Sequence, residues 1–125
     1  MFISPQEILM GRDAAAPLTP EMKKNLDILL VAVNKLRAMW GKPLTVSSGY
    51  RPPATNAAIG GAKQSNHMTC SAVDFKDDGS LAKFLISRLD VLEDCGLWLE
   101  SPEKTKGWVH VQIVPPKSGR RVFLP

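Results

Sequence analysis

Apolar residues recur at helical spacing in the longest amphipathic stretch of the chain, residues 20–40. Thr19 is a good N-cap for this stretch, and Pro20 suits the first helical position. Gly41 ends it, with Pro43 just beyond. One face collects the apolar side chains of Leu26, Leu29, Leu30, Val33, Leu36 and Trp40. The pattern predicts a long helix that buries this face against the rest of the molecule.

Shorter segments predict three further helices. The capping box Ser-Pro-Gln-Glu at residues 4–7 opens a short helix near the start of the chain. A second short helix is expected over residues 54–59. Ser80 caps a longer helix over residues 81–94, which Gly96 stops.

Alternating or continuous apolar runs predict the strands. These runs are residues 44–48, 71–76, 97–100 and 107–114, with 121–124 as a candidate edge strand. The polar connection 101–106 indicates a hairpin between the last two long strands. The elements predict an α+β fold in a single domain of residues 1–125, with helices packed on one face of a small, largely antiparallel sheet.

Charge narrows the classes of partner. The chain has 16 Lys and Arg against 12 Asp and Glu, an excess that favours anionic polymers such as nucleic acid or a bacterial cell wall. The basic residues are scattered apart from Lys117, Arg120 and Arg121, and few aromatic residues lie among them. Because no nucleic-acid-binding motif is present, we do not expect nucleic acid as the partner.

The sequence also predicts where the protein is made. No apolar run approaches the roughly 18 residues of a membrane span, and residues 1–5 lack the regions of a secretory signal. We therefore expect cytoplasmic synthesis, no membrane insertion and a monomer. Cys70 and Cys95 are expected to be free thiols, although the sequence leaves a disulfide between them open.

Only two histidines occur in the chain, and both lie where a metal ligand could form. His67 follows a glycine-rich polar stretch. Asp74 lies among apolar strand residues, where a carboxylate is costly to bury unless it is paired or bound to a metal. Strand alternation puts His110 on the same face as Trp108 and Gln112. Two imidazoles and one carboxylate suit a catalytic zinc, although each residue alone also fits a loop, strand-end or core position.

Three separate motifs extend this pattern. They are Ser47-Ser48-Gly49-Tyr50-Arg51, then Ser65-Asn66-His67-Met68-Thr69-Cys70-Ser71-Ala72-Val73-Asp74, then Trp108-Val109-His110. In this order they resemble the M15 family of zinc D-Ala-D-Ala peptidases, whose signature is Ser-Gly-Tyr-Arg, Ser-x-His-x-x-Gly-x-Ala-x-Asp and Trp-x-His. That family includes D,D-carboxypeptidases, D,D-dipeptidases and phage endolysins that cut L-Ala-D-Glu bonds. It shares its fold with the hedgehog signalling domain.

The resemblance implies a metal centre and a catalytic arginine. His67, Asp74 and His110 would hold a zinc ion (Zn2+). Arg51 would steady the substrate carbonyl or the developing oxyanion, a task that suits its fixed, planar set of donors. A surface arginine in a turn is the alternative for Arg51.

The same resemblance implies three residues around the substrate. Ser65 would help to hold the terminal carboxylate of the substrate, although a hydroxyl that caps its own loop is an equal alternative. Tyr50 and Trp108 would lie around the substrate site, more as packing residues than as catalysts.

Two positions depart from the family signature. Cys70 stands where the motif has glycine, a residue that commonly serves a positive φ or a close backbone approach, so the loop is expected to differ in shape. Gly107 stands three residues before the last histidine, where many family members place the catalytic acid. Glu100 is the expected substitute because the hairpin brings its strand opposite that of His110, and Glu103 is the second candidate. A surface carboxylate at the end of a strand is the alternative for Glu100.

The predicted function is zinc-dependent hydrolysis of peptide bonds in peptidoglycan stem peptides, of the D-Ala-D-Ala carboxypeptidase or the L-Ala-D-Glu or D,D-endopeptidase type. Its small size and lack of a signal favour a phage endolysin or virion-associated enzyme that acts on the wall after release. Two other functions stay open. One is an inactive, zinc-containing wall-binding or structural module, and the other is a cysteine hydrolase that pairs Cys70 with a histidine.

Overall fold

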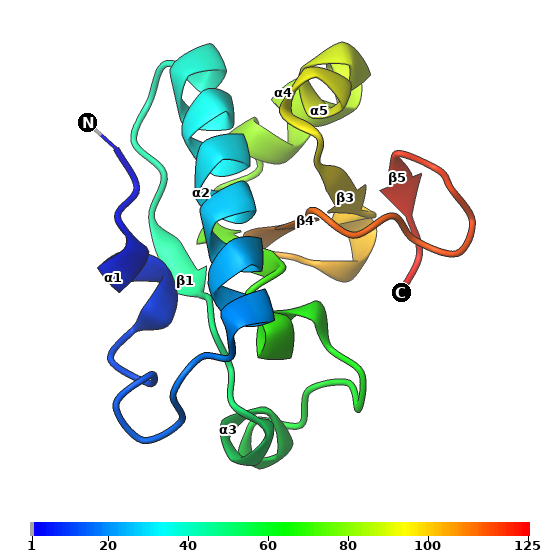
Figure 1. Ribbon diagram of the computed structural model, residues 1–125. Helices are drawn as coiled ribbons and strands as arrows, with labels where there is room; N and C mark the ends of the chain where they lie inside the picture. The colour runs from blue at the N-terminus through cyan, green and yellow to red at the C-terminus, as the bar shows by residue number, and fades with distance from the viewer. Residues whose placement is uncertain (1) are drawn as a thin grey trace.

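A five-stranded sheet forms the centre of the computed structural model, which describes residues 2–125 (Figure 1). The strands are β1 (Val46–Ser48), β2 (Ala72–Lys76), β3 (Trp98–Glu100), β4 (Trp108–Gln112) and β5 (Val122–Phe123). Their order is β1-β2-β4-β3-β5, and neighbours are antiparallel except β3 and β5, which are parallel. The predicted α+β fold with a largely antiparallel sheet is confirmed, including the edge strand near the C-terminus.

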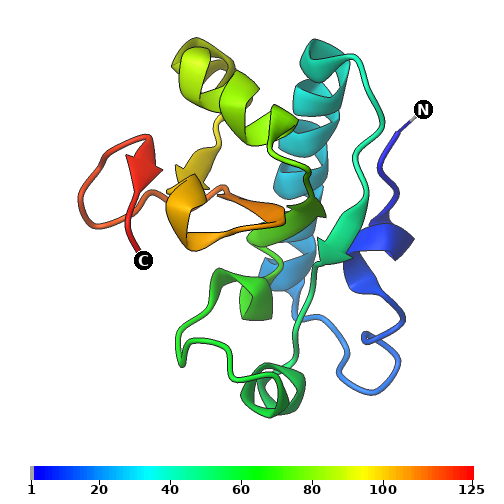
Figure 2. The same ribbon diagram turned by 180° about the vertical axis from the view of Figure 1, so that it is seen from behind.

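The main helices lie together on one side of the sheet. The helices are α1 (Pro5–Leu9), α2 (Pro20–Trp40), α3 (Pro53–Ala58), α4 (Ser80–Ser87) and α5 (Leu89–Cys95), with 3-10 turns η1 (Asn66–Thr69) and η2 (Pro102–Lys104). The long α2 crosses this side with α5 packed beside it, and α1 contacts β1 (Figure 1). Seen from behind, the other side of the sheet carries no long helix (Figure 2).

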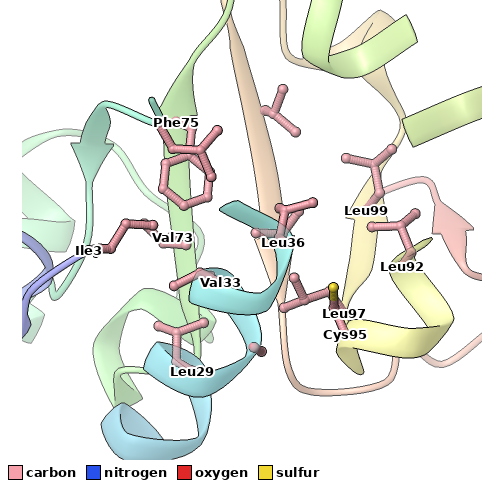
Figure 3. Close-up of a cluster of buried hydrophobic side chains, with 14 of the residues drawn as sticks. Ile3, Leu29, Val33, Leu36, Val73, Phe75, Leu92, Cys95, Leu97 and Leu99 are labelled. Atoms are coloured by element: carbon pink, nitrogen blue, oxygen red, sulfur yellow. The ribbon is translucent and has the colours of Figure 1, made fainter. Parts of the chain in front are cut away.

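The long helix begins and ends as its sequence predicts. The Thr19 side chain accepts a hydrogen bond from the backbone N–H of Met22, and Gly41 ends the helix with a φ of 77°. Leu29, Val33 and Leu36 are fully buried. Figure 3 shows these three side chains in one cluster with side chains of β2 and of the segment from α5 to β3.

The helix predicted over residues 81–94 is in fact two helices. The backbone at Arg88 has φ −135° and ψ 65°, which ends α4 and starts α5 in a new direction. Ser80 is the first residue of α4 and not its cap. The cap position is Gly79, and the Asp77 carboxylate accepts hydrogen bonds from two backbone N–H groups of the first turn. After the break, α5 packs against α2 with Val91, Leu92 and Cys95 buried.

Two predictions about the whole chain can be compared with the structure. Cys70 and Cys95 are both buried free thiols, as expected. Within residues 2–125, every helix is too short or too polar to span a lipid bilayer.

We predict that Leu36→Ala lowers the free energy of unfolding by about 3 kcal/mol, because a fully buried leucine leaves a cavity between α2 and the sheet. Thermal denaturation followed by circular dichroism should show a midpoint lower by about 10 °C. Val31→Ala on the same helix is the control, since Val31 is 73% exposed and its truncation should change stability by no more than about 0.5 kcal/mol. Equal losses in both variants would contradict this account of the core.

Candidate functional site

The sheet face turned away from α2 carries one crosswise row of side chains. Strand register pairs Ser48 with Asp74, and Asp74 with His110. One further step along the β3–β4 register places Glu100 opposite His110, and Glu100 is paired with Phe123 of β5. The neighbours of Asp74 in β2 pack into the core, so alternation directs Asp74 to the opposite face. The row therefore draws one residue from each strand.

His67 reaches this row from η1, which leads into β2. The Ser65 hydroxyl accepts a hydrogen bond from the backbone N–H of His67, and η1 ends at Cys70. Cys70 adopts a left-handed conformation with φ 60° and ψ 30°. This is the conformation for which glycine is the usual residue, so the cysteine follows the path that a glycine would take at this position of the motif.

His67, Asp74 and His110 converge on one point. Oδ1 of Asp74 lies 3.2 Å from Nε2 of His67 and 2.8 Å from Nδ1 of His110. The three ligand atoms all lie within 4.8 Å of one another. Two imidazole nitrogens and one carboxylate oxygen at this spacing fit a single metal ion with room for a further ligand.

The second ring nitrogen of each histidine is held by a hydrogen bond. Nδ1 of His67 lies 2.9 Å from the carbonyl oxygen of Gly49, and a carbonyl can only accept, so Nδ1 carries the proton. Nε2 of His110 lies 2.8 Å from Oε1 of Gln112, whose amide in turn donates to the Val114 carbonyl. Both contacts orient the rings so that Nε2 of His67 and Nδ1 of His110 face Asp74, the orientation from which these two nitrogens can bind a metal ion once they carry no proton.

The second oxygen of Asp74 anchors the predicted catalytic arginine. Nη2 of Arg51 donates to Oδ2 of Asp74 at 3.2 Å, and Nε donates to the Ser48 hydroxyl at 2.9 Å. Burial would raise the pKa of Asp74, but its hydrogen bonds to His110 and His67 outweigh that effect and hold the pKa well below its usual range. Asp74 is therefore ionised and can act as a metal ligand.

His67, Asp74 and His110 line a pocket of about 1060 Å³. Arg51, Ser65, Glu100 and Trp108 all line this pocket, so the structure brings these predicted residues together with the three metal ligands. Trp108 is 37% exposed, which leaves part of its ring free for contact with a bound molecule.

Glu100 is better placed than either alternative acid position. It lines the metal pocket, and burial raises its pKa despite the opposing charge of His110. Gly107 lies before β4 with φ 93° and lines other hollows of the molecule. Glu103 lies in η2 beside one of these hollows, together with Asp77. The geometry thus favours Glu100 as the group that exchanges protons at this site.

Tyr50 lies apart from the pocket. Its side chain is 2% exposed, and its hydroxyl donates to the carbonyl of Ala16 at 2.9 Å. Its backbone carbonyl accepts a hydrogen bond from Arg12. This position fits the packing role considered for Tyr50 and gives no support to its prediction as a substrate-binding residue.

Cys70 is poorly suited to act as a nucleophile. Its side chain is fully buried in the core, and burial raises the pKa of its thiol to about 11. The thiol is therefore protonated near neutral pH, whereas a cysteine hydrolase needs a thiolate.

Several residues of the site have little or no sequence signal. Ser48 and Gly49 belong to the first motif, but the motif does not reveal that the Gly49 carbonyl holds His67 and that the Ser48 hydroxyl holds Arg51. Gln112 is different, because strand alternation already places it on the face of His110. Phe123 packs edge-on against the His110 ring at 6.2 Å between ring centres, and only the parallel pairing of β5 reveals this contact.

We predict that Gly49→Ala weakens metal binding by about 10- to 100-fold, the usual cost of disturbing a group that orients a histidine ligand. A Cβ at this position would overlap the backbone of Ile8, so the backbone at residue 49 or at residue 8 must shift, and we expect this shift to disturb the Gly49 carbonyl that holds His67. Titration calorimetry with a divalent metal measures the change. Gly41→Ala is the control, because its φ of 77° strains any side chain but its Cβ meets nothing within 4 Å. Equal metal affinity in both variants would contradict the role of Gly49.

Comparison with known families agrees with this geometry. The family model described as Peptidase M15 matches residues 3–112, a span that contains all three motifs and every residue of the metal centre. A search of curated proteins found no match. Because the family match covers most of the chain, this protein belongs to the M15 peptidase family.

Proposed function

We propose that this protein is a zinc-dependent hydrolase of peptide bonds in the stem peptides of bacterial peptidoglycan. Membership of the M15 family implies a metallopeptidase, and peptidases of this family use zinc. The observation that carries the proposal is the meeting of His67, Asp74 and His110 at the floor of an open pocket that Glu100 also lines.

The residues of the pocket can take separate roles in the hydrolysis. When bound, zinc would lower the pKa of a water molecule and polarise the scissile carbonyl. Glu100 would accept the proton of the attacking water and return it to the leaving amine, so that the C–N bond breaks and the carbonyl carbon keeps the water oxygen. Arg51, held by Asp74 and Ser48, would offer its remaining N–H groups to the oxygen on which negative charge develops.

Charge and the polar side of the pocket support a wall peptide as substrate. Stem peptides carry carboxylates, and the chain has a formal net charge of +4. Ser65 lies at the pocket with Gln64 and Asn66, where hydroxyl and amide groups can bind a carboxylate or a peptide group. Trp108 offers an exposed ring edge for packing. The bond would be of the D-Ala-D-Ala or the L-Ala-D-Glu type, and the setting a phage endolysin or a virion-associated enzyme.

The alternative is a zinc-containing module that binds wall peptides without cutting them. The observation in its favour is Gly107, which stands at the position of the family acid. This alternative predicts that neither the wild type nor a Glu100 variant cleaves peptidoglycan, although both still hold zinc.

We predict that purified peptidoglycan releases new amino or carboxyl termini when incubated with the zinc-loaded protein, and that a chelator abolishes this release until zinc is restored. The protein should carry one zinc per chain by elemental analysis, and His67→Ala and His110→Ala should lose both zinc and activity because each removes one of three ligands. Added zinc should also raise the thermal midpoint of the wild type. Equal wall cleavage after complete removal of zinc would refute the proposal.

We predict that Glu100→Gln lowers kcat by about 100- to 10,000-fold, the usual contribution of a general base, while zinc content stays unchanged. Only ionised Glu100 accepts a proton, and its pKa is raised by burial. Wild-type kcat should therefore fall as the pH drops through this raised value, and the glutamine variant should lose this acid limb.

Glu103→Gln is the matched control for this experiment. It removes the same charge from the loop after β3, but Glu103 lies beside a different hollow, so kcat should stay within about twofold of the wild type. If kcat instead falls strongly in Glu103→Gln and stays unchanged in Glu100→Gln, Glu103 and not Glu100 is the general base.

A further inference from the structure

The segment of residues 113–125 lies beyond the family match and yet forms part of the pocket. Its pocket-lining members are Val114, Pro115, Pro116, Lys117, Ser118, Phe123, Leu124 and Pro125. The match ends at residue 112, so the ligands and the proposed base lie inside it and this segment lies outside it. The pocket thus combines the chemistry shared by the family with a boundary that the family pattern does not specify.

This segment is held against the site at both of its ends. At its start, the Val114 carbonyl accepts the hydrogen bond of Gln112, which also holds His110. Near its end, the Phe123 carbonyl accepts from the backbone N–H of Ser101, next to Glu100, and the Phe123 ring packs on His110. These contacts place the segment at a defined position relative to the metal ligands.

Arg121 attaches the segment to β3 and to the residue before it. Its guanidinium lies 4.3 Å from the centre of the Trp98 ring and donates to the Leu97 carbonyl at 2.9 Å. The Arg121 carbonyl accepts from the N–H of Leu99, so that side chain and backbone both tie β5 to β3. A segment attached in this way can act as a fixed wall for a bound molecule.

The two walls of the pocket differ in chemistry. The loop before η1 contributes the polar side chains of Gln64, Ser65 and Asn66. The segment 113–125 contributes mainly apolar side chains, of which Val114 is 38% exposed and Leu124 is 65% exposed. Apolar groups exposed beside a polar catalytic row gain free energy when a ligand covers them.

We infer that residues 113–125 form a specificity wall, on which Val114 and Leu124 contact an apolar side chain of the peptide substrate next to the scissile bond. The inference rests on the proposed function, because it assigns this wall to the substrate of that reaction. In a stem peptide, the methyl groups of the alanine residues are the compact apolar groups beside a D-Ala-D-Ala or L-Ala-D-Glu bond. Covering one methyl group supplies a modest part of the affinity, and the polar side chains of Gln64, Ser65 and Asn66 are available to the polar groups of the peptide.

The test uses binding, so that it does not depend on turnover. The stem pentapeptide L-Ala–D-Glu–L-Lys–D-Ala–D-Ala is titrated into the zinc-loaded Glu100→Gln protein, and into the same protein with Val114→Ser or Leu124→Ser added. Both side chains are exposed, so the fold should tolerate the changes. We expect the Kd to rise by about five- to tenfold in each wall variant, the usual effect of losing a small apolar contact.

The matched control is Val31→Ser in the Glu100→Gln protein, which makes the same kind of change on the exposed surface of α2, away from the pocket. Its Kd should equal that of the parent. In the catalytically competent protein, the wall variants should raise KM with kcat within about twofold, as expected for a contact made equally in the ground and transition states.

The outcomes separate this inference from the proposed function. Equal Kd values in the wall and control variants, or no binding by any of them, overturn the specificity wall even if the wild type hydrolyses peptidoglycan. Weaker binding only in the wall variants supports the wall, and it does so even if the wild type fails to cut peptidoglycan, which would overturn the proposed function alone.

Discussion

The structure depends on one buried carboxylate, Asp74, which lies in the second strand of the sheet. An ionised carboxylate in this position is costly unless each oxygen finds a partner. One oxygen faces both histidines, and the other accepts a hydrogen bond from Arg51. These partners come from three separate segments of the chain, so satisfying this single group brings η1, β4 and the turn after β1 to the same place. The metal centre and the local fold are therefore consequences of the same constraint.

The sheet converts this constraint into a precise geometry. Paired residues on neighbouring strands stand about 5 Å apart, which is the spacing required to bring side chains of successive strands into contact. Asp74, His110 and Glu100 use this spacing directly, whereas His67 reaches the row from a short turn whose hydroxyl cap and left-handed end fix its direction. Hydrophobic packing on the opposite face holds the strands in register. The core on the other side of the same strands thus stabilises the sheet that carries the polar row.

Sequence patterns predicted those parts of the molecule that local chemistry determines. The limits of α2 follow from its cap, its proline and its terminal glycine, and the predicted hairpin correctly brings the strand of Glu100 beside that of His110. The break at Arg88 could not be predicted from the apolar pattern, because Leu81, Leu85 and Leu92 keep helical spacing across it. The roles of Gly49 and Phe123 could not be predicted, since one acts through its backbone carbonyl and the other through a parallel strand pairing formed across a long separation in sequence.

The hydrogen-bond chain from His110 through Gln112 to Val114 joins the metal centre to the segment that borders the pocket. The single amide group of Gln112 makes both contacts. Its oxygen orients His110, and its nitrogen donates to the carbonyl of Val114. A displacement of the segment would pull on this amide and so on the ring that faces Asp74. Phe123 packs edge-on against the same ring and imposes a second limit on its orientation. The exposed side chains of Val114 and Leu124 make neither of these contacts, so on the proposed specificity wall they are the positions where a substitution would leave the orientation of His110 unchanged.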